Sequence, residues 1–149
     1  MKNIFIAFLF LIFLSTQSFA QKDKYKMIQG LGYLHTQVTM LIVHWEKHPL
    51  NHKPVDDHEA MLQEHIITEM EHDEEWAEYM MVENNLSHFE HVLDDKIKKS
   101  INQALEFYHY VISHLRKPEE VKIQYDDWKK KLAETETLLF EVIYPALCK

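Results

Sequence analysis

Residues that break helices are rare in this chain, and their positions constrain its fold more than any other feature. The 149 residues include only two Gly and four Pro. Both Gly lie in one stretch, at positions 30 and 32, and three Pro, at 49, 54 and 118, fall where the helical pattern of apolar residues is interrupted. No segment shows the sustained alternation of apolar and polar residues that a half-buried strand requires. The sequence therefore predicts an all-α protein.

Four segments carry helical periodicity, and local signals between them set their ends. The segments cover residues 23–48, 57–83, 87–115 and 118–146. Asp56 followed by Glu59 predicts a capping box before the second segment, and Ser87 with Glu90 predicts another before the third. Pro118 suits the first position of the fourth helix. Four amphipathic helices of similar length joined by short turns predict an up-down-up-down four-helix bundle.

On a helical projection, the apolar residues of each segment gather on one side. The predicted core-facing residues are Met27, Leu31, Leu34, Val38, Leu41, Ile42 and Trp45 in the first segment; Leu62, Ile66, Trp76 and Met80 in the second; Phe89, Leu93, Ile97, Ile101, Ala104, Tyr108, Val111 and Leu115 in the third; and Val121, Tyr125, Trp128, Leu132, Leu139, Ile143 and Ala146 in the fourth. In the second segment, the solvent side is expected to carry Glu64, Glu71, Glu74, Glu75 and Glu78.

The first twenty residues have the three-part pattern of a secretory signal peptide. Lys2 precedes an unbroken apolar run over residues 4–14, and Ser18 and Ala20 place small residues at a cleavage position. The run is shorter than the roughly 20 residues that span a bilayer. We therefore expect cleavage after Ala20 and one mature domain over residues 21–149. The mature protein is expected to be exported, periplasmic or extracellular, with no membrane insertion after cleavage.

The charge balance limits the kinds of partner that the protein can bind, and the single Cys limits its disulfide bonds. The formal net charge is −8, and it becomes about −9 when Lys2 leaves with the signal peptide. This acidic balance argues against binding to nucleic acid or to an anionic membrane surface. Because Cys148 is the only thiol in the sequence, an internal disulfide is excluded and stability must come from packing.

In the second segment, one carboxylate and two imidazoles are predicted to point toward the core. Glu69 projects near the middle of the apolar arc, with His65 four residues before it and His72 three residues after it. Counting along antiparallel helices places His35 level with Glu69, and Glu136 within about one turn of His72. We predict a metal site at these five residues, and zinc, iron, manganese and copper all fit the ligand types. The alternative is a buried polar layer in which Glu69 pairs with a protonated His or a Tyr hydroxyl.

A second candidate metal site lies in the His-rich tract over residues 44–58. His44 and His48 are four residues apart at the end of the first helix, and His52 and His58 follow beside two Asp. This spacing predicts a surface site for zinc, copper or nickel at one end of the bundle. The alternative is a solvated bundle end whose His residues share no target.

The spacing resembles two families of metal-binding helical bundles. Ferritin-like proteins use Glu-x-x-His on two helices and single Glu on the others, and Glu69-x-x-His72 with Glu136 matches part of that pattern. A second Glu-x-x-His, at Glu106 and His109, falls on the predicted solvent side of its helix. Hemerythrin-like proteins use a His on the first helix and His-x-x-x-Glu on the second; both are present here, but their His-x-x-x-His on the third helix is missing. Both matches are partial and assign no activity.

These observations favour an exported protein that binds or stores a metal, rather than an enzyme. Ser100 and Ser113 have no His and Asp oriented toward them, and there is no Gly-rich phosphate loop. One alternative is a metal-free interaction protein that docks a protein partner, or a second copy as a homodimer, through aromatic and Met residues. Those residues are Tyr25, Tyr33, Met40, Trp76, Tyr79, Met80 and Met81. The other alternative is a non-haem metal oxidoreductase that uses the predicted core site.

Overall fold

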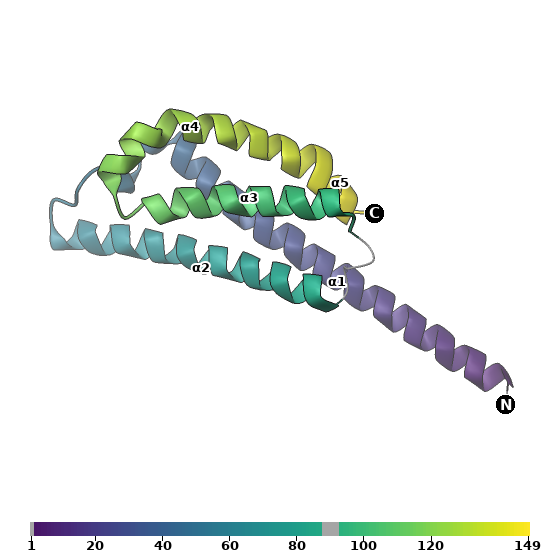
Figure 1. The fold of residues 1–149 in the computed structure, drawn as a ribbon. Helices are drawn as coiled ribbons and strands as arrows, with labels where there is room; N and C mark the ends of the chain where they lie inside the picture. Colours follow the sequence, from purple (N-terminus) through teal and green to yellow (C-terminus); the bar gives the residue numbers. More distant parts are fainter. Residues whose placement is uncertain (1, 88–92) are drawn as a thin grey trace.

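Helices make up nearly all of the protein. The computed structural model describes residues 2–87 and 93–149, and it describes side chains for residues 21–83, 93–117 and 124–149. Within these ranges there are four long helices and no strand: α1 (Lys2–Val43), α2 (Asp57–Ser87), α3 (Asp95–His114) and α4 (Pro118–Thr137) (Figure 1). A π-helical segment (Leu138–Ile143) continues α4 into the short α5 (Tyr144–Leu147). The all-α prediction is confirmed.

The start of α2 agrees with the predicted capping box. The backbone N–H of Glu59 donates to Asp56 Oδ1 over 2.8 Å, and Glu59 Oε2 accepts from the backbone N–H of Val55 over 2.7 Å. The first bond satisfies a donor that the first helical turn leaves free, and the return bond goes to Val55, one residue before the cap, rather than to the N–H of Asp56. The fourth helix also begins at Pro118, as predicted.

Two other helix ends differ from the predictions. The first helix ends at Val43 rather than at residue 48, and two 3₁₀ turns follow, Trp45–Lys47 and Pro49–Asn51. Pro49 has no backbone N–H and cannot continue an α-helix. Ser87 is the last residue of α2 and not the cap of α3, and Glu90 lies outside the described residues. The cap of α3 is Asp94, whose side chain accepts from the backbone N–H of Ile97 over 2.9 Å.

Three of the four predicted core faces are correct among the residues whose side chains are described. On α1, α3 and the α4 region, the predicted residues are buried, apart from Ile97, Tyr125 and Ala146, which are half-buried; Phe89 and Val121 lie outside the described side chains. The core joins these faces into one cluster, in which Trp128 and Tyr108 are the largest fully buried side chains.

The predicted core face of α2 is wrong. Leu62 is 44% exposed, and Ile66, Trp76 and Met80 are only half-buried. The residues that α2 buries are Gln63, Ile67, Met70, Glu74, Ala77 and Met81. Their spacing alternates between three and four residues after Ile67, which is the a/d pattern of a helix packed along a neighbour. Relative to the prediction, the helix is turned by about one residue, or roughly 100°.

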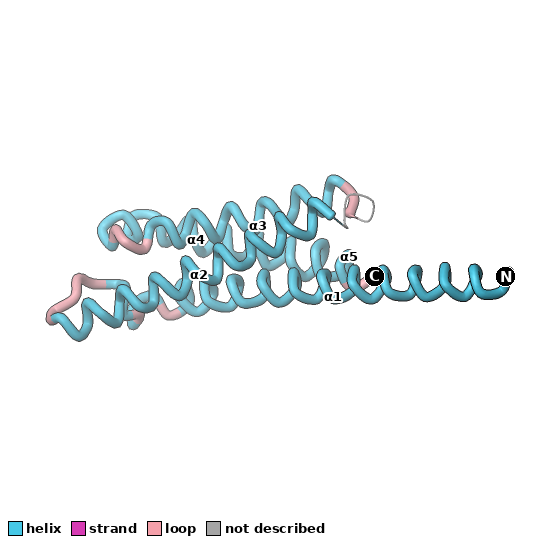
Figure 2. Tube along the Cα trace, turned by 90° about the horizontal axis from the view of Figure 1, so that it is seen from below, coloured by secondary structure: helices cyan, strands magenta, loops and turns pink. Residues whose placement is uncertain are grey.

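The helices pack around one core, and α1 extends beyond it. α1 lies along α2 and also contacts α3, α4 and α5. Figures 1 and 2 both show the N-terminal part of α1 projecting past the bundle. Figure 2 also shows that loops occur only at the helix connections and the C-terminal end of the described chain. In the part of the chain that the structure describes, no helix combines the length and apolar character needed to cross a membrane.

Candidate metal centre

The predicted core set does not assemble around Glu69. Glu69, His65 and His72 are all exposed on α2, because the turned helix presents Met70 to the core in place of Glu69. His72 is 74% exposed at its side chain and lies 3.9 Å from the carboxylate of Asp73. The prediction that Glu69 points into the core is therefore wrong.

Two members of the predicted core set do lie together. His35 Nε2 is 3.7 Å from Glu136 Oε1, and His35 Nδ1 is 3.2 Å from the hydroxyl of Tyr108. The His35 side chain is 11% exposed and Tyr108 is fully buried. Burial lowers the pKa of His35, and the nearby Glu136 carboxylate offsets only part of that effect. Burial likewise raises the pKa of Tyr108. His35, Tyr108 and Glu136 therefore form a buried polar layer of hydrogen-bonded neutral groups with a carboxylate at its outer edge.

The bundle-end histidines have separate surroundings. His48 stacks on Trp45 with ring centroids 6.2 Å apart and accepts from the backbone N–H of Leu50 over 3.3 Å. His52 Nε2 lies 2.7 Å from Glu59 Oε1, while His44 and His58 are exposed. Among the described residues, these four histidines belong to no group of three ligands within reach of one ion.

A different group has metal-ligand geometry. Glu74 and Glu78 of α2 and His109 of α3 each offer one ligand atom, and these atoms all lie within 4.8 Å of one another. His109 Nδ1 is 2.6 Å from Glu74 Oε1, a hydrogen bond that joins the two helices. We call these three residues the α2–α3 site. It is the one such group among the residues that the structure describes.

The helices position the α2–α3 site through heptad spacing. Glu74 occupies one of the a/d positions of α2, between buried Met70 and Ala77, and Glu78 lies one turn further along the same helix. On α3, His109 follows buried Tyr108, and consecutive helical residues project roughly 100° apart. The imidazole therefore leaves the core side of α3 and reaches toward α2, where its side chain is 66% exposed.

The electrostatics of the α2–α3 site favour a cation. The Glu74 side chain is only 11% exposed. Burial raises the pKa of its carboxyl, the hydrogen bond and charge of His109 lower it in part, and the negative charges of Glu78 and Glu71 raise it further. The contact with His109 thus offsets the effect of burial on Glu74 only in part. A divalent cation at these three ligand atoms would place positive charge beside the Glu74 carboxylate, in place of its hydrogen bond with His109.

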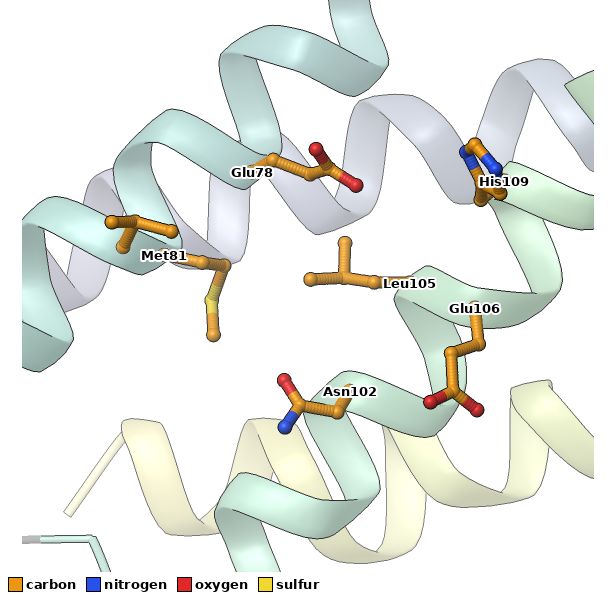
Figure 3. A pocket seen from close by; sticks show the side chains of 7 residues that line it. Glu78, Met81, Asn102, Leu105, Glu106 and His109 are labelled. Carbon is orange, nitrogen blue, oxygen red and sulfur yellow. The ribbon is translucent and has the colours of Figure 1, made fainter.

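The site opens onto a cleft between α2 and α3. The cleft has a volume of about 420 Å³ and is lined by Glu78, Met81, Val82, Asn102, Leu105, Glu106 and His109. Figure 3 shows Glu78 and Leu105 pointing toward one another across it, with Glu106 on the side of Asn102. Two of the three ligands therefore border the opening, and Glu74 lies behind them.

The sequence contained a signal for this site that the helical projection missed. The helical projection puts Glu106-x-x-His109 on the solvent side of α3, and both residues are exposed. That surface borders the cleft because α2 lies beside it and contributes Glu78, Met81 and Val82 to the lining. Glu74 was expected in solvent and is 9% exposed. The heptad pattern of Ile67, Met70, Ala77 and Met81 also includes Glu74. We call this row of buried residues the α2 seam.

Comparison with known proteins assigns neither a family nor a function to this site. No family model, curated protein or solved structure matches the chain.

Proposed function

We propose that this protein binds a divalent transition metal through Glu74, Glu78 and His109, as an exported binding or storage protein. The observation that carries the proposal is the 2.6 Å contact between Glu74, buried in the α2 seam, and His109 of α3. One imidazole and two carboxylates suit zinc, iron, manganese or copper. These ligands replace the predicted set around Glu69.

The contact between Glu74 and His109 also fits a hydrogen-bonded pair that binds no metal. The negative charge beside this pair distinguishes that hypothesis from a metal site. A lone Glu–His pair needs no third acidic group, whereas here Glu78 adds a carboxylate within ligand distance. Like charges near a buried carboxylate are unfavourable unless a cation joins them. The oxidoreductase alternative relied on the predicted core site, and among the described residues that set forms no group of three ligands around one ion.

Matched substitutions on α2 and α3 test the proposal. Untagged protein would be titrated with zinc by calorimetry, and its metal content measured by elemental analysis. We expect His109→Gln and Glu78→Gln to weaken binding by about 100-fold or more, since even outer-shell changes cost 10–100-fold. The controls are His72→Gln and Glu69→Gln, which remove the same chemical groups from exposed positions on α2 and should leave binding unchanged.

Two results would contradict the proposal. If wild-type protein takes up no zinc, copper, iron or manganese, the metal-binding function is wrong. If the control pair abolishes uptake while His109→Gln and Glu78→Gln retain it, the ligands are those first predicted around Glu69 and not the α2–α3 site.

We further propose that the mature chain is an up-down-up-down bundle released by cleavage after Ala20. The support is the signal-peptide pattern of the sequence and the short connections from α2 to α3 and from α3 to α4. Mass spectrometry of protein expressed with its own N-terminus, recovered from the periplasm or the medium, should give Gln21 as the first residue. An intact Met1 in correctly folded protein would contradict cleavage.

The alternative of a metal-free interaction protein is supported by exposed apolar and aromatic side chains on α1. Tyr25, Tyr33 and Met40 of α1 are 67%, 55% and 53% exposed and lie on one side of the helix. Met81, by contrast, is buried in the core. If this strip docks a partner copy, sedimentation should show a dimer that the double change Tyr33→Ser and Met40→Ser dissociates. A monomer at all concentrations would exclude the homodimer.

A further inference from the structure

The cleft beside the α2–α3 site gives a bound metal access to a further ligand. The protein offers three donor atoms there, whereas zinc and related ions take four or more. Glu78 and His109 both line the cleft, and Glu74 lies on the buried side. The coordination positions that the protein leaves open are thus directed into the cleft and not into the core.

The lining of the cleft restricts the charge of that ligand. Two carboxylates neutralise a divalent ion, and Glu106 adds a third carboxylate to the same cleft. Among the side chains that the structure describes, the lining of this cleft contains no Lys or Arg. An anionic ligand would meet net negative charge, so a neutral donor atom with a cationic tail is favoured.

The apolar residues of the cleft restrict the shape of the ligand. Met81 is 4% exposed, Leu105 is half-buried, and Val82 borders the opening. Leu105 projects into the cleft between Glu78 and Glu106 in Figure 3. A short hydrocarbon chain lying on Leu105 and Met81 would join the metal end of the cleft to the Glu106 end.

We propose that the metal-loaded cleft binds small organic cations that carry a neutral nitrogen donor. The donor, an imidazole or similar nitrogen, occupies the open position of the metal, the hydrocarbon chain covers Leu105, and a terminal ammonium pairs with Glu106. This inference rests on the proposed metal-binding function, because without the ion the cleft has no anchor for the donor.

Cobalt provides a spectroscopic test with matched probes. Untagged full-length protein would be loaded with one equivalent of Co²⁺, and its visible spectrum followed during titration with three imidazoles that share one donor. They are 1-(3-aminopropyl)imidazole, 1-propylimidazole and 3-(imidazol-1-yl)propanoate, with cationic, neutral and anionic tails. We expect the cationic probe to bind roughly three- to fivefold more tightly than the neutral one, as for a partly exposed ion pair, and the anionic probe to bind most weakly. His109→Gln protein serves as the blank for Co²⁺ on surface histidines.

A substitution of Glu106 separates this inference from the metal site itself. Glu106→Gln should retain Co²⁺ binding and make the cationic and neutral probes equal. If Co²⁺ binds at the site but no probe changes its spectrum, the open positions do not face the cleft and this inference alone fails. Equal or tighter binding of the anionic probe also overturns it. If Co²⁺ does not bind more tightly to wild type than to His109→Gln protein, the proposed function and this inference fail together.

Discussion

Replacing Glu74 by Leu should abolish metal binding and at the same time stabilise the metal-free protein. The position is 9% exposed and lies in the α2 seam between Met70 and Ala77. Leu fits the apolar character of this seam, whereas an ionised carboxylate loses hydration there without a full counter-charge. A residue kept for packing alone would show the opposite effect on stability.

The magnitude follows from three contributions. Burying a Leu side chain contributes about 1.5–3 kcal/mol, and removing the carboxylate relieves its desolvation. Against this, the hydrogen bond from His109 to a charged group is lost, a contribution of about 1.5–3 kcal/mol. Since His109 is 66% exposed, water restores most of that bond. A net stabilisation of about 1–3 kcal/mol is expected, as for other buried ionic groups replaced by apolar ones.

The pH dependence has a definite sign. Burial raises the pKa of Glu74 above its ordinary value of 4.5, so the folded state holds this proton more tightly than the unfolded state. The stability that protonated Glu74 contributes is present below pH 4.5 and is lost as pH rises through the raised folded pKa. The advantage of Glu74→Leu should therefore be largest near neutral pH and smaller near pH 4.5.

Thermal and urea unfolding of chelator-treated protein provide the assay. For a domain of this size, Tm should rise by roughly 3–5 °C per kcal/mol. Glu75→Leu is the matched control, because Glu75 is exposed on the same helix and its replacement should change stability by less than about 0.5 kcal/mol. If Glu74→Leu lowers Tm while Glu75→Leu does not, Glu74 stabilises the metal-free fold and the charge argument for a metal is refuted.

Metal affinity at the α2–α3 site should fall on acidification, because protons compete for its oxygen and nitrogen atoms. The Kd measured by chelator competition should rise at least about tenfold between pH 7.5 and 5.5. A constant Kd would exclude these ligands. The pKa of His35 is lowered by burial, so the stability that its neutral form contributes is present above pH 6.5 and is lost as pH falls through the folded pKa. His35→Gln should therefore lessen the drop in urea midpoint between pH 7 and 5, and an unchanged drop would show that His35 is not its source. Gly32→Ala should stabilise α1 by about 0.5–1 kcal/mol, because the nearest atom to its new Cβ is 3.7 Å away. Gly30→Ala should gain less, since its Cβ would lie 3.0 Å from the Trp76 ring; equal gains in urea unfolding would show that the ring moves freely.

Much of the fold follows from the sequence where one face of a helix is clearly more apolar than the others. On α1, residues such as Leu34, Val38 and Leu41 repeat on one side, and all three are buried. The same holds for α3, where Ile101 and Val111 are fully buried. For these helices any other rotation would expose large apolar side chains, so periodicity alone determines the face.

The face of α2 could not be determined in this way. Its apolar residues come in adjacent pairs, among them Ile66–Ile67 and Met80–Met81, and the members of a pair project roughly 100° apart. Either member can face the core, and the choice depends on the neighbouring helices. Since Ile67 and Met81 are the buried members, Glu69 turns outward and Glu74 turns inward.

Polar residues in the α2 seam differ in how their hydrogen bonds are satisfied, and this difference separates structural from functional roles. Gln63, at the other buried polar position of α2, donates from Nε2 to the carbonyls of Pro49 and His52 over 2.6 and 2.9 Å. Its burial anchors the connection between α1 and α2 and needs no ligand. Glu74 is compensated in part by His109, which lies mostly in solvent.

Two adjacent residues of α3, Tyr108 and His109, make polar contacts with two different helices. The Tyr108 hydroxyl contacts His35 on α1, while His109 contacts Glu74 on α2. The first contact joins groups that are neutral when buried, and it requires no ion. The second joins an imidazole to a buried carboxylate with Glu78 beside it, an acidic group that the proposed metal would neutralise. Changes at His35 should consequently alter stability without altering metal affinity, since sites with no shared partners act independently.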